Sequence, residues 1–110
     1  MVTVVDEKSF KKEVLDQPGL VFVDFWSITC PPCKMMDPVI EGAVKMFPNV
    51  KFFKVDINKS PMLAGQYVIT SIPCIVVFKA GKEIGRSIGY RPINDFENII
   101  KKYTQNSSLA

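Results

Sequence analysis

The sequence has no histidine among its 110 residues. Histidine is the usual general acid or base near neutral pH and a common zinc ligand, so its absence excludes histidine-based catalytic pairs and most zinc chemistry. Cysteine is scarce too. The three cysteines are an odd number, whereas a small secreted domain held together by disulfides has more of them, in even count. With 47% hydrophobic and 11% aromatic residues, the chain can fold around one core without such crosslinks.

Long apolar runs and clustered charge are also missing. No stretch approaches membrane-spanning length, and residues 1–6 show no basic segment followed by a long apolar one, as a secretory leader would. The net charge of +3 comes from 14 basic and 11 acidic residues that are scattered, without a basic block that could follow a phosphate backbone. The sequence therefore predicts one soluble, cytoplasmic domain over residues 1–110 that binds neither nucleic acid nor a membrane.

Strand-like and helix-like segments alternate along the chain. Apolar or β-branched runs predict strands over residues 2–5, 20–26, 50–56, 74–79 and 82–88, the last two forming an antiparallel hairpin. Helical spacing predicts helices over 6–16, from the cysteine pair to 47, over 59–67 and from 93 to 103. This order predicts an α/β fold, a three-layer sandwich in which a central five-stranded mixed sheet is flanked by four helices.

Three details of the helices can be predicted. Pro38 falls inside the second helix and should kink it rather than divide it. The last helix begins either with a capping box of Asn94 and Glu97 or with Pro92 in its first turn. Residues 105–110 are small and polar, and we expect a frayed tail there.

Cys30 and Cys33 enclose two prolines at the junction between the strand 20–26 and the following helix. Two cysteines three residues apart then lie at a helix N-terminus, where the helix dipole and free amide hydrogens favour a thiolate over a thiol. Such a dithiol can alternate with a disulfide, so redox exchange is the leading interpretation. Structural or metal-bound cysteines are the alternative.

Asp24 interrupts the otherwise apolar strand 20–26. A central strand is covered on both faces, and a buried carboxylate without a partner tends to hold its proton. We therefore expect the pKa of Asp24 to be raised. Its role is either functional or that of one half of a buried ion pair.

Together these motifs resemble those of the thioredoxin family over essentially the whole chain. The matching segments are 23–26 (Val-Asp-Phe-Trp), 30–34 (Cys-Pro-Pro-Cys-Lys), Pro38, 54–56 (Lys-Val-Asp), 72–73 (Ile-Pro), 78–81 (Phe-Lys-Ala-Gly) and Gly89. A pair of cysteines with this spacing is weak evidence alone, but it is specific in this order and context. The resemblance implies the thioredoxin fold, with a cis peptide bond before Pro73 that faces the cysteines.

The resemblance also implies a function, that of a protein-disulfide reductase. Cys30, at the helix cap and partly exposed, would be the nucleophile, and the more buried Cys33 would be the resolving thiol. Asp24 would lie beneath Cys33 as its base, tuned by Lys54 on the neighbouring strand. The partners would be disulfide-containing substrate proteins and an electron donor of the thioredoxin-reductase type. We expect a monomer with no cofactor apart from the Cys30–Cys33 disulfide.

Three residues depart from the family's pattern around the nucleophile. Thr29 replaces a tryptophan, Pro31 replaces a glycine, and Cys74 replaces a threonine. Pro31 removes an amide hydrogen near the Cys30 sulfur and stiffens the loop, whereas Pro32 stands where the family already has proline. We expect both prolines to modulate the redox couple.

The remaining candidates surround the cysteines. The expected apolar rim for the substrate backbone consists of Thr29, Ile72, Pro73 and Gly89. Tyr90 either narrows this rim or is an ordinary half-exposed aromatic residue. Cys74 is a third regulatory thiol, a ligand that completes a metal or iron–sulfur site with Cys30 and Cys33, or a small buried residue that fills the space of threonine.

Overall fold

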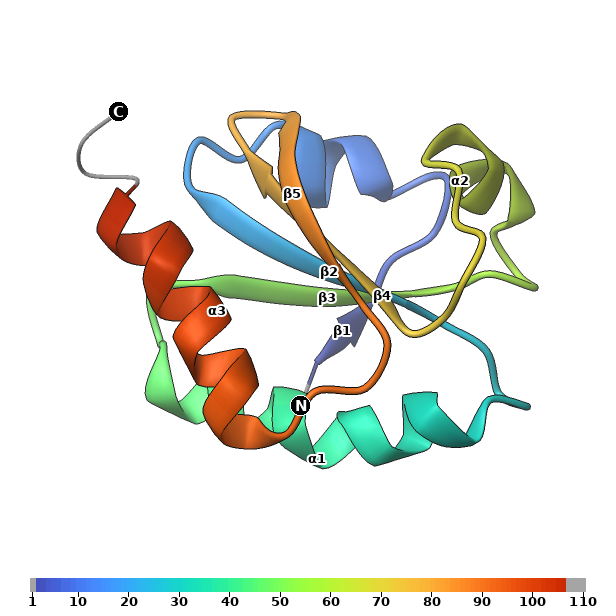
Figure 1. Ribbon diagram of the computed structural model, residues 1–110. Coiled ribbons are helices and arrows are strands. Elements are labelled where there is room, and N and C mark those ends of the chain that lie inside the picture. The colour runs from blue at the N-terminus through green and yellow to red at the C-terminus, as the bar shows by residue number, and fades with distance from the viewer. Residues whose placement is uncertain (1, 107–110) are drawn as a thin grey trace.

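The computed structural model describes residues 2–106, which form a five-stranded sheet between two layers of helices (Figure 1). Its strands are β1 (Thr3–Val4), β2 (Leu20–Trp26), β3 (Lys51–Asp56), β4 (Cys74–Lys79) and β5 (Lys82–Ile88). Its helices are η1 (Lys11–Leu15), α1 (Pro31–Met46), α2 (Pro61–Gln66) and α3 (Ile93–Asn106). The predicted α/β sandwich with a five-stranded sheet and four helices is confirmed.

The sheet is mixed, with strand order β1-β3-β2-β4-β5. The strands β1, β3 and β2 are parallel, whereas β4 is antiparallel to both β2 and β5. The hairpin between β4 and β5 turns at Ala80 and Gly81, both of which have positive φ. A Cβ at Gly81 would lie 2.7 Å from the carbonyl oxygen of Leu15, so this turn packs closely against η1.

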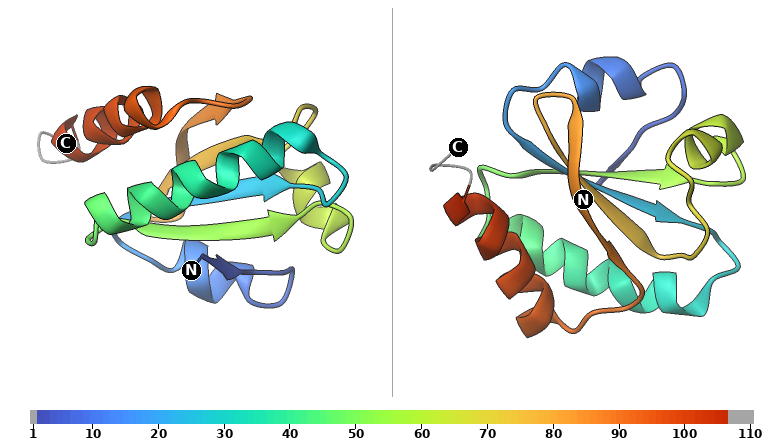
Figure 2. Two further views of the ribbon diagram at one scale, coloured as in Figure 1. Left: turned by 90° about the horizontal axis from the view of Figure 1, so that it is seen from below. Right: turned by 45° about the horizontal axis from the view of Figure 1, so that its top comes forward.

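Two hydrophobic cores fill the two faces of the sheet, because side chains alternate along each strand. The core under α1 and α3 includes Phe22, Met36, Ile40, Ile75 and Phe96. The core under η1 and α2 includes Phe10, Val14, Val23, Leu63, Cys74 and Phe78. Figure 2 shows α1 and α3 on the same side of the sheet and η1 on the other. The N-terminus of α1, which carries the cysteine pair, thus follows directly from the buried strand β2.

The bounds of α1 and α2 differ from the predicted ones by one or two residues, and the helices differ from the predictions in three further respects. The first helix is a π-helical segment, Lys11–Leu15, that is shorter than the predicted range 6–16. Asp6 lies in a turn before it, where Asp6 Oδ1 accepts hydrogen bonds from the amides of Lys8 and Ser9 at 2.9 and 3.0 Å. The predicted capping box of Asn94 and Glu97 is wrong, because α3 already begins at Ile93. In the first turn of α3 the carbonyl of Pro92 accepts a hydrogen bond from the amide of Phe96. Residues 105 and 106 are helical rather than part of a tail, and residues 107–110 lie outside the described residues.

Pro38 lies within α1, which continues through it as a single helix. Over residues 2–106, none of the helices is both long enough and apolar enough to span a membrane.

Candidate active site

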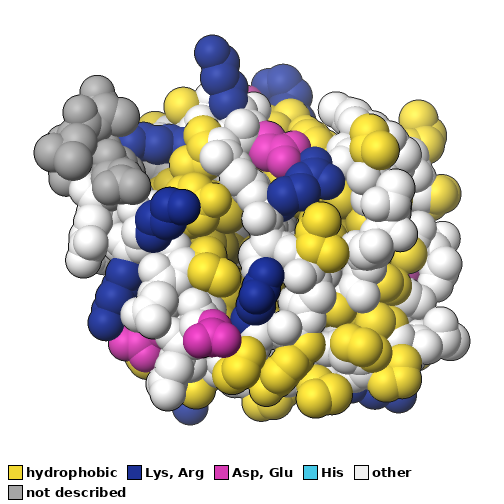
Figure 3. All heavy atoms as spheres, in the orientation of Figure 1, with side chains coloured by type: hydrophobic (Ala, Val, Ile, Leu, Met, Phe, Trp, Pro, Cys, Tyr) yellow, Lys and Arg dark blue, Asp and Glu magenta, His cyan; other side chains and the backbone are white. Residues whose placement is uncertain are grey.

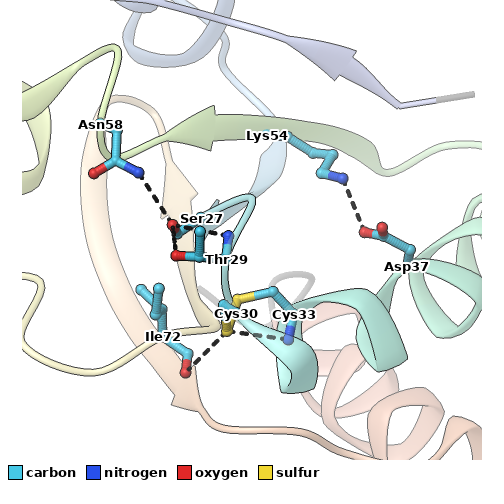
Figure 4. The surroundings of a disulfide bond; sticks show 8 residues. All are labelled: Ser27, Thr29, Cys30, Cys33, Asp37, Lys54, Asn58 and Ile72. Atoms are coloured by element: carbon cyan, nitrogen blue, oxygen red, sulfur yellow. Dashed lines mark hydrogen bonds and ion pairs between the residues drawn. A yellow bond between two sulfur atoms is a disulfide. The ribbon is translucent and has the colours of Figure 1, made fainter.

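Cys30 and Cys33 form a disulfide at the start of α1, with their Cα atoms 5.2 Å apart (Figure 4). Cys30 is the N-cap of the helix and the two prolines occupy its first two positions. Proline suits these positions because the first amides of a helix have no intrahelical partner. Since neither proline has an N–H group, the amide of Cys33 is the first in α1 that can donate, and it points at Cys30 Sγ from 3.2 Å.

Burial of the pair differs in part from the prediction. Cys33 is buried, as expected, with 3% of its surface exposed. Cys30 is 7% exposed, so the expectation of a partly exposed nucleophile is wrong for this disulfide-bonded state. The order is nevertheless as predicted, since Cys30 is the more exposed residue of the two.

A polar network that the sequence analysis missed fixes the loop before Cys30. Ser27 Oγ lies 3.2 Å from Thr29 Oγ1 and accepts from Asn58 Nδ2 at 3.1 Å (Figure 4). Ser27 is buried, whereas Thr29 is exposed. A serine two residues before a threonine at a helix start is a local signal that could have identified Ser27, because such side chains commonly bond to nearby groups in turns. Nothing local in the sequence indicates Asn58.

The segment that contains Ile72 and Pro73 lies close to Cys30. The Ile72–Pro73 peptide is cis, as predicted, and the Ile72 carbonyl oxygen lies 3.9 Å from Cys30 Sγ. The carbonyl of Pro73 accepts from the amide of Gly89 at 2.8 Å. Gly89 has a φ of +89°, a conformation that suits glycine. The structure therefore places Ile72 beside Cys30, and Gly89 is bonded to Pro73, the next residue.

Exposed apolar side chains surround this end of the molecule. Ile28, Met35 and Tyr90 are 65%, 54% and 39% exposed. Figure 3 shows hydrophobic side chains gathered over the N-terminal half of α1, at the lower right of the view. Large exposed apolar groups that cluster mark a surface for contact with another molecule.

Asp24 is 2% exposed, and neither of its carboxyl oxygens has a hydrogen-bond partner among the described residues. Burial raises its pKa from 3.8 to about 7; the positive charge of Lys54 opposes this rise and the negative charge of Asp37 adds to it. The predicted rise is confirmed. Asp24 lies among Phe22, Ile40 and Phe96, on the side of the sheet that α1 covers.

Lys54 is aligned with Asp24 in the register of β2 and β3, but its ammonium pairs with another carboxylate. Lys54 Nζ lies 2.8 Å from Asp37 Oδ1 on α1 and 4.6 Å from the centre of the Trp26 ring. The sequence analysis missed Asp37. Its position, one helical turn after Cys33, was the available signal, because residues four apart share a helix face.

Cys74 does not join the other two cysteines. Its side chain, 1% exposed, lies in the core under η1 and α2, on the opposite face of the sheet from Asp24. Burial raises the pKa of its thiol, although Arg86 opposes this effect. Within residues 2–106, no three cysteine, aspartate or glutamate side chains gather closely enough to hold a metal ion. The interpretation of Cys74 as a small buried residue is therefore the one that fits its surroundings.

Comparison with known proteins agrees with this geometry. The thioredoxin family model matches residues 1–102. A thioredoxin of Chlamydia trachomatis is 41% identical over 94% of this chain and 99% of its own length. A thioredoxin of Rickettsia felis is 40% identical over 93% of this chain and 98% of its own length. A thioredoxin of Porphyra purpurea is 35% identical over 93% of this chain and 96% of its own length.

Family and disulfide together define the chemistry. Thioredoxins interact with disulfide-containing proteins and with a reductase that recharges them, and the Cys30–Cys33 disulfide supplies the couple for this exchange. The chain belongs to the thioredoxin family, and it is a thiol–disulfide oxidoreductase that acts by dithiol–disulfide exchange.

Proposed function

We propose that the Cys-Pro-Pro-Cys segment is the active site of a protein-disulfide reductase in which Cys30 attacks and Cys33 resolves. The Cys30 thiolate attacks one sulfur of a substrate disulfide, forms a mixed disulfide and releases one substrate thiolate. The Cys33 thiolate then attacks Cys30 Sγ, forms the Cys30–Cys33 disulfide and releases the second thiolate. Two electrons pass to the substrate, and the two protons lost by the dithiol balance those gained by the released thiolates.

The placement of Cys30 at the N-cap of α1 carries this proposal. The Cys33 amide that faces Cys30 Sγ at 3.2 Å and the helix dipole both favour negative charge on that sulfur. The attacking group must be a thiolate, so this sulfur is the better nucleophile of the pair. Its greater exposure than Cys33 supports the same assignment.

Asp24 is the base that takes the proton of Cys33 in the resolving step. Its pKa of about 7 lets it accept a proton near neutral pH, which a solvent-exposed carboxylate does poorly. Cys33 is a buried residue of α1 and Asp24 is buried on the face of the sheet that α1 covers, which supports this assignment. Lys54 opposes the rise of the Asp24 pKa and so modulates this step.

The prolines between the cysteines modulate the couple. Pro31 leaves one amide donor fewer near the Cys30 sulfur than a glycine would, which disfavours the thiolate, while Pro32 extends the rigid start of α1. Fewer donors to the thiolate make the dithiol more reducing, and the stiffness of the loop acts on the disulfide as well. The reduction potential therefore differs from that of a motif with glycine at this position.

Thr29, Ile72, Pro73, Gly89 and Tyr90 form the surface on which a substrate segment lies. The Ile72 carbonyl beside Cys30 and the apolar groups around it suit an extended backbone with a disulfide at its centre. Cys74 lies outside this surface, in the opposite core. We place the protein in the cytoplasm as a monomer, with disulfide-containing proteins as substrates, a thioredoxin-reductase-type enzyme as electron donor and no cofactor besides its own disulfide.

The reduction potential and the rate of reduction of a protein disulfide test the proposal. Equilibration in a dithiothreitol redox buffer, followed by Trp26 fluorescence, should give a potential closer to the value of thioredoxin, about −270 mV, than to that of an oxidising protein. The reduced protein should reduce the substrate disulfide, and the Cys30→Ser variant should not. A potential near about −120 mV, typical of oxidising members of this fold, would contradict the assignment as a reductase.

A further inference from the structure

Lys54 has two acidic neighbours on the α1 side of the sheet, Asp24 and Asp37. Within residues 2–106, its ammonium forms an ion pair with Asp37 only. Asp24 is its partner in the parallel register of β2 and β3, where adjacent strands are about 4.8 Å apart and aligned residues project to the same face. Asp37 lies on α1. Lys54 Nζ is 2.8 Å from Asp37 Oδ1 (Figure 4). Neither oxygen of Asp24 has a hydrogen-bond partner within residues 2–106.

We propose that Asp37 is a positioning residue of this site: it holds the Lys54 ammonium against α1 and so keeps it from closing an ion pair with Asp24. This inference deepens the proposed role of Asp24 as the base for Cys33, and it rests on that role. Asp37 acts through Lys54 and touches neither substrate nor sulfur.

Trp26 provides the second anchor of the lysine. The ammonium lies 4.6 Å from the centre of the Trp26 ring, a distance at which a cation is attracted by the face of an indole. Trp26 follows Asp24 by two residues on β2, so both side chains project to the same face. A lysine side chain is flexible and its charge is compact, so these two contacts decide where the charge lies. Removing Asp37 leaves Asp24 as the acidic group beside Lys54 in register.

The position of this one charge matters because the surroundings of Asp24 are otherwise mostly apolar. Phe22, Phe52, Ile75 from β4, Ile40 from α1 and Phe96 from α3 line the space around it. The charged groups that act on Asp24 are Lys54 from β3 and Asp37 from α1. Burial raises the pKa of the Cys74 thiol on β4, and the charge of Asp24 adds to this rise. In the proposed function, the reduced Cys33 thiol of α1 also faces Asp24.

An ammonium in contact with Asp24 would favour the carboxylate and lower the pKa of Asp24. The residue would then be ionised well below neutral pH and would be a weaker base toward the Cys33 thiol. By holding Lys54 elsewhere, Asp37 keeps Asp24 able to take up a proton in the pH range in which exchange occurs.

The direct test is a carbon-13 NMR titration of the Asp24 carboxyl in the full oxidised chain. Asp37→Asn should lower the pKa of Asp24 by about one pH unit or more, since an opposite charge comes into contact with it. In a Lys54→Met background the same substitution should shift it far less. Asp37→Glu, which keeps a carboxylate within reach of Lys54, should leave the pKa of Asp24 at its parental value.

A matched control is Glu97→Gln on α3, which breaks the Glu97–Lys101 ion pair of 3.1 Å and should leave the Asp24 titration unchanged. The Asp37 side chain is 48% exposed, so its substitution does not disturb the core. Asp37→Ala is a second variant, and thermal unfolding verifies that each protein is folded.

Two outcomes would overturn the inference. Asp37→Asn could leave the Asp24 pKa unchanged, or it could lower it equally in the Lys54→Met background, which would mean that Asp37 acts only through its own charge. The pH dependence of the exchange rate should shift in the direction of the NMR titration. Failure of the proposed function would look different: Asp24→Asn would keep the full exchange rate, while the NMR titrations would still report whether Asp37 holds Lys54.

Discussion

The carboxylate of Asp24 should make the folded protein less stable as the pH rises from 3.8 to about 7. The folded chain keeps the Asp24 proton up to about pH 7, whereas the unfolded chain releases it near 3.8. Between these values the folded state binds more protons, so the free energy of unfolding falls with rising pH. At about 1.4 kcal/mol per pH unit, the full loss above pH 7 is about 4 kcal/mol. This is large compared with the stability of a small domain, about 5–15 kcal/mol.

Asp24→Asn removes this loss while it keeps the shape of the side chain. We expect the variant to be more stable than the parent by an amount that grows by about 3 kcal/mol between pH 5 and pH 8. Urea unfolding of both oxidised proteins measures the difference, and about 3 kcal/mol moves the urea midpoint by about 1–3 M. Asp95→Asn, at an exposed position of α3, is the matched control and should show no comparable growth. A difference between Asp24→Asn and parent that stays constant with pH would refute the reasoning.

Further predictions concern Cys74 and Gly81. Under native conditions an alkylating reagent should modify Cys30 of the reduced protein, whereas Cys74 should react only in denaturant, because it is 1% exposed and burial raises the pKa of its thiol. Rapid modification of Cys74, located by mass spectrometry, would contradict its placement. Gly81→Ala should destabilise the protein by at least about 1 kcal/mol, because φ is +79° and the new Cβ would lie 2.7 Å from the Leu15 carbonyl oxygen. Thermal unfolding measures this, and an unchanged midpoint would argue against the close turn.

The strands could be predicted from the sequence because their signal is local. The bounds of β2, β4 and β5 agree with the predicted ranges 20–26, 74–79 and 82–88, since apolar runs end there at turn residues. The start of α3 could not be predicted with the same certainty, because Asn94 and Pro92 offer competing caps and only the backbone decides between them.

For the site, the sequence predicts which residues carry chemistry better than it predicts their partners. The motifs identified the cysteine pair and Asp24, but Lys54 pairs with Asp37, a contact between β3 and α1 that depends on tertiary packing. The face of the sheet on which Cys74 lies could have been predicted from the sequence, because side chains alternate along a strand. Cys74 shares its face with Val76 and Phe78 rather than with Ile75.

The order of attack by the two cysteines is the central claim, and trapping the mixed disulfide tests it most directly. The Cys33→Ser variant, mixed with a protein that has one accessible disulfide, should accumulate a covalent complex through Cys30, visible by mass spectrometry of the intact complex and released by dithiothreitol. The Cys30→Ser variant should form little or none, because Cys33 is 3% exposed. A stable complex through Cys33 with none through Cys30 would contradict the account.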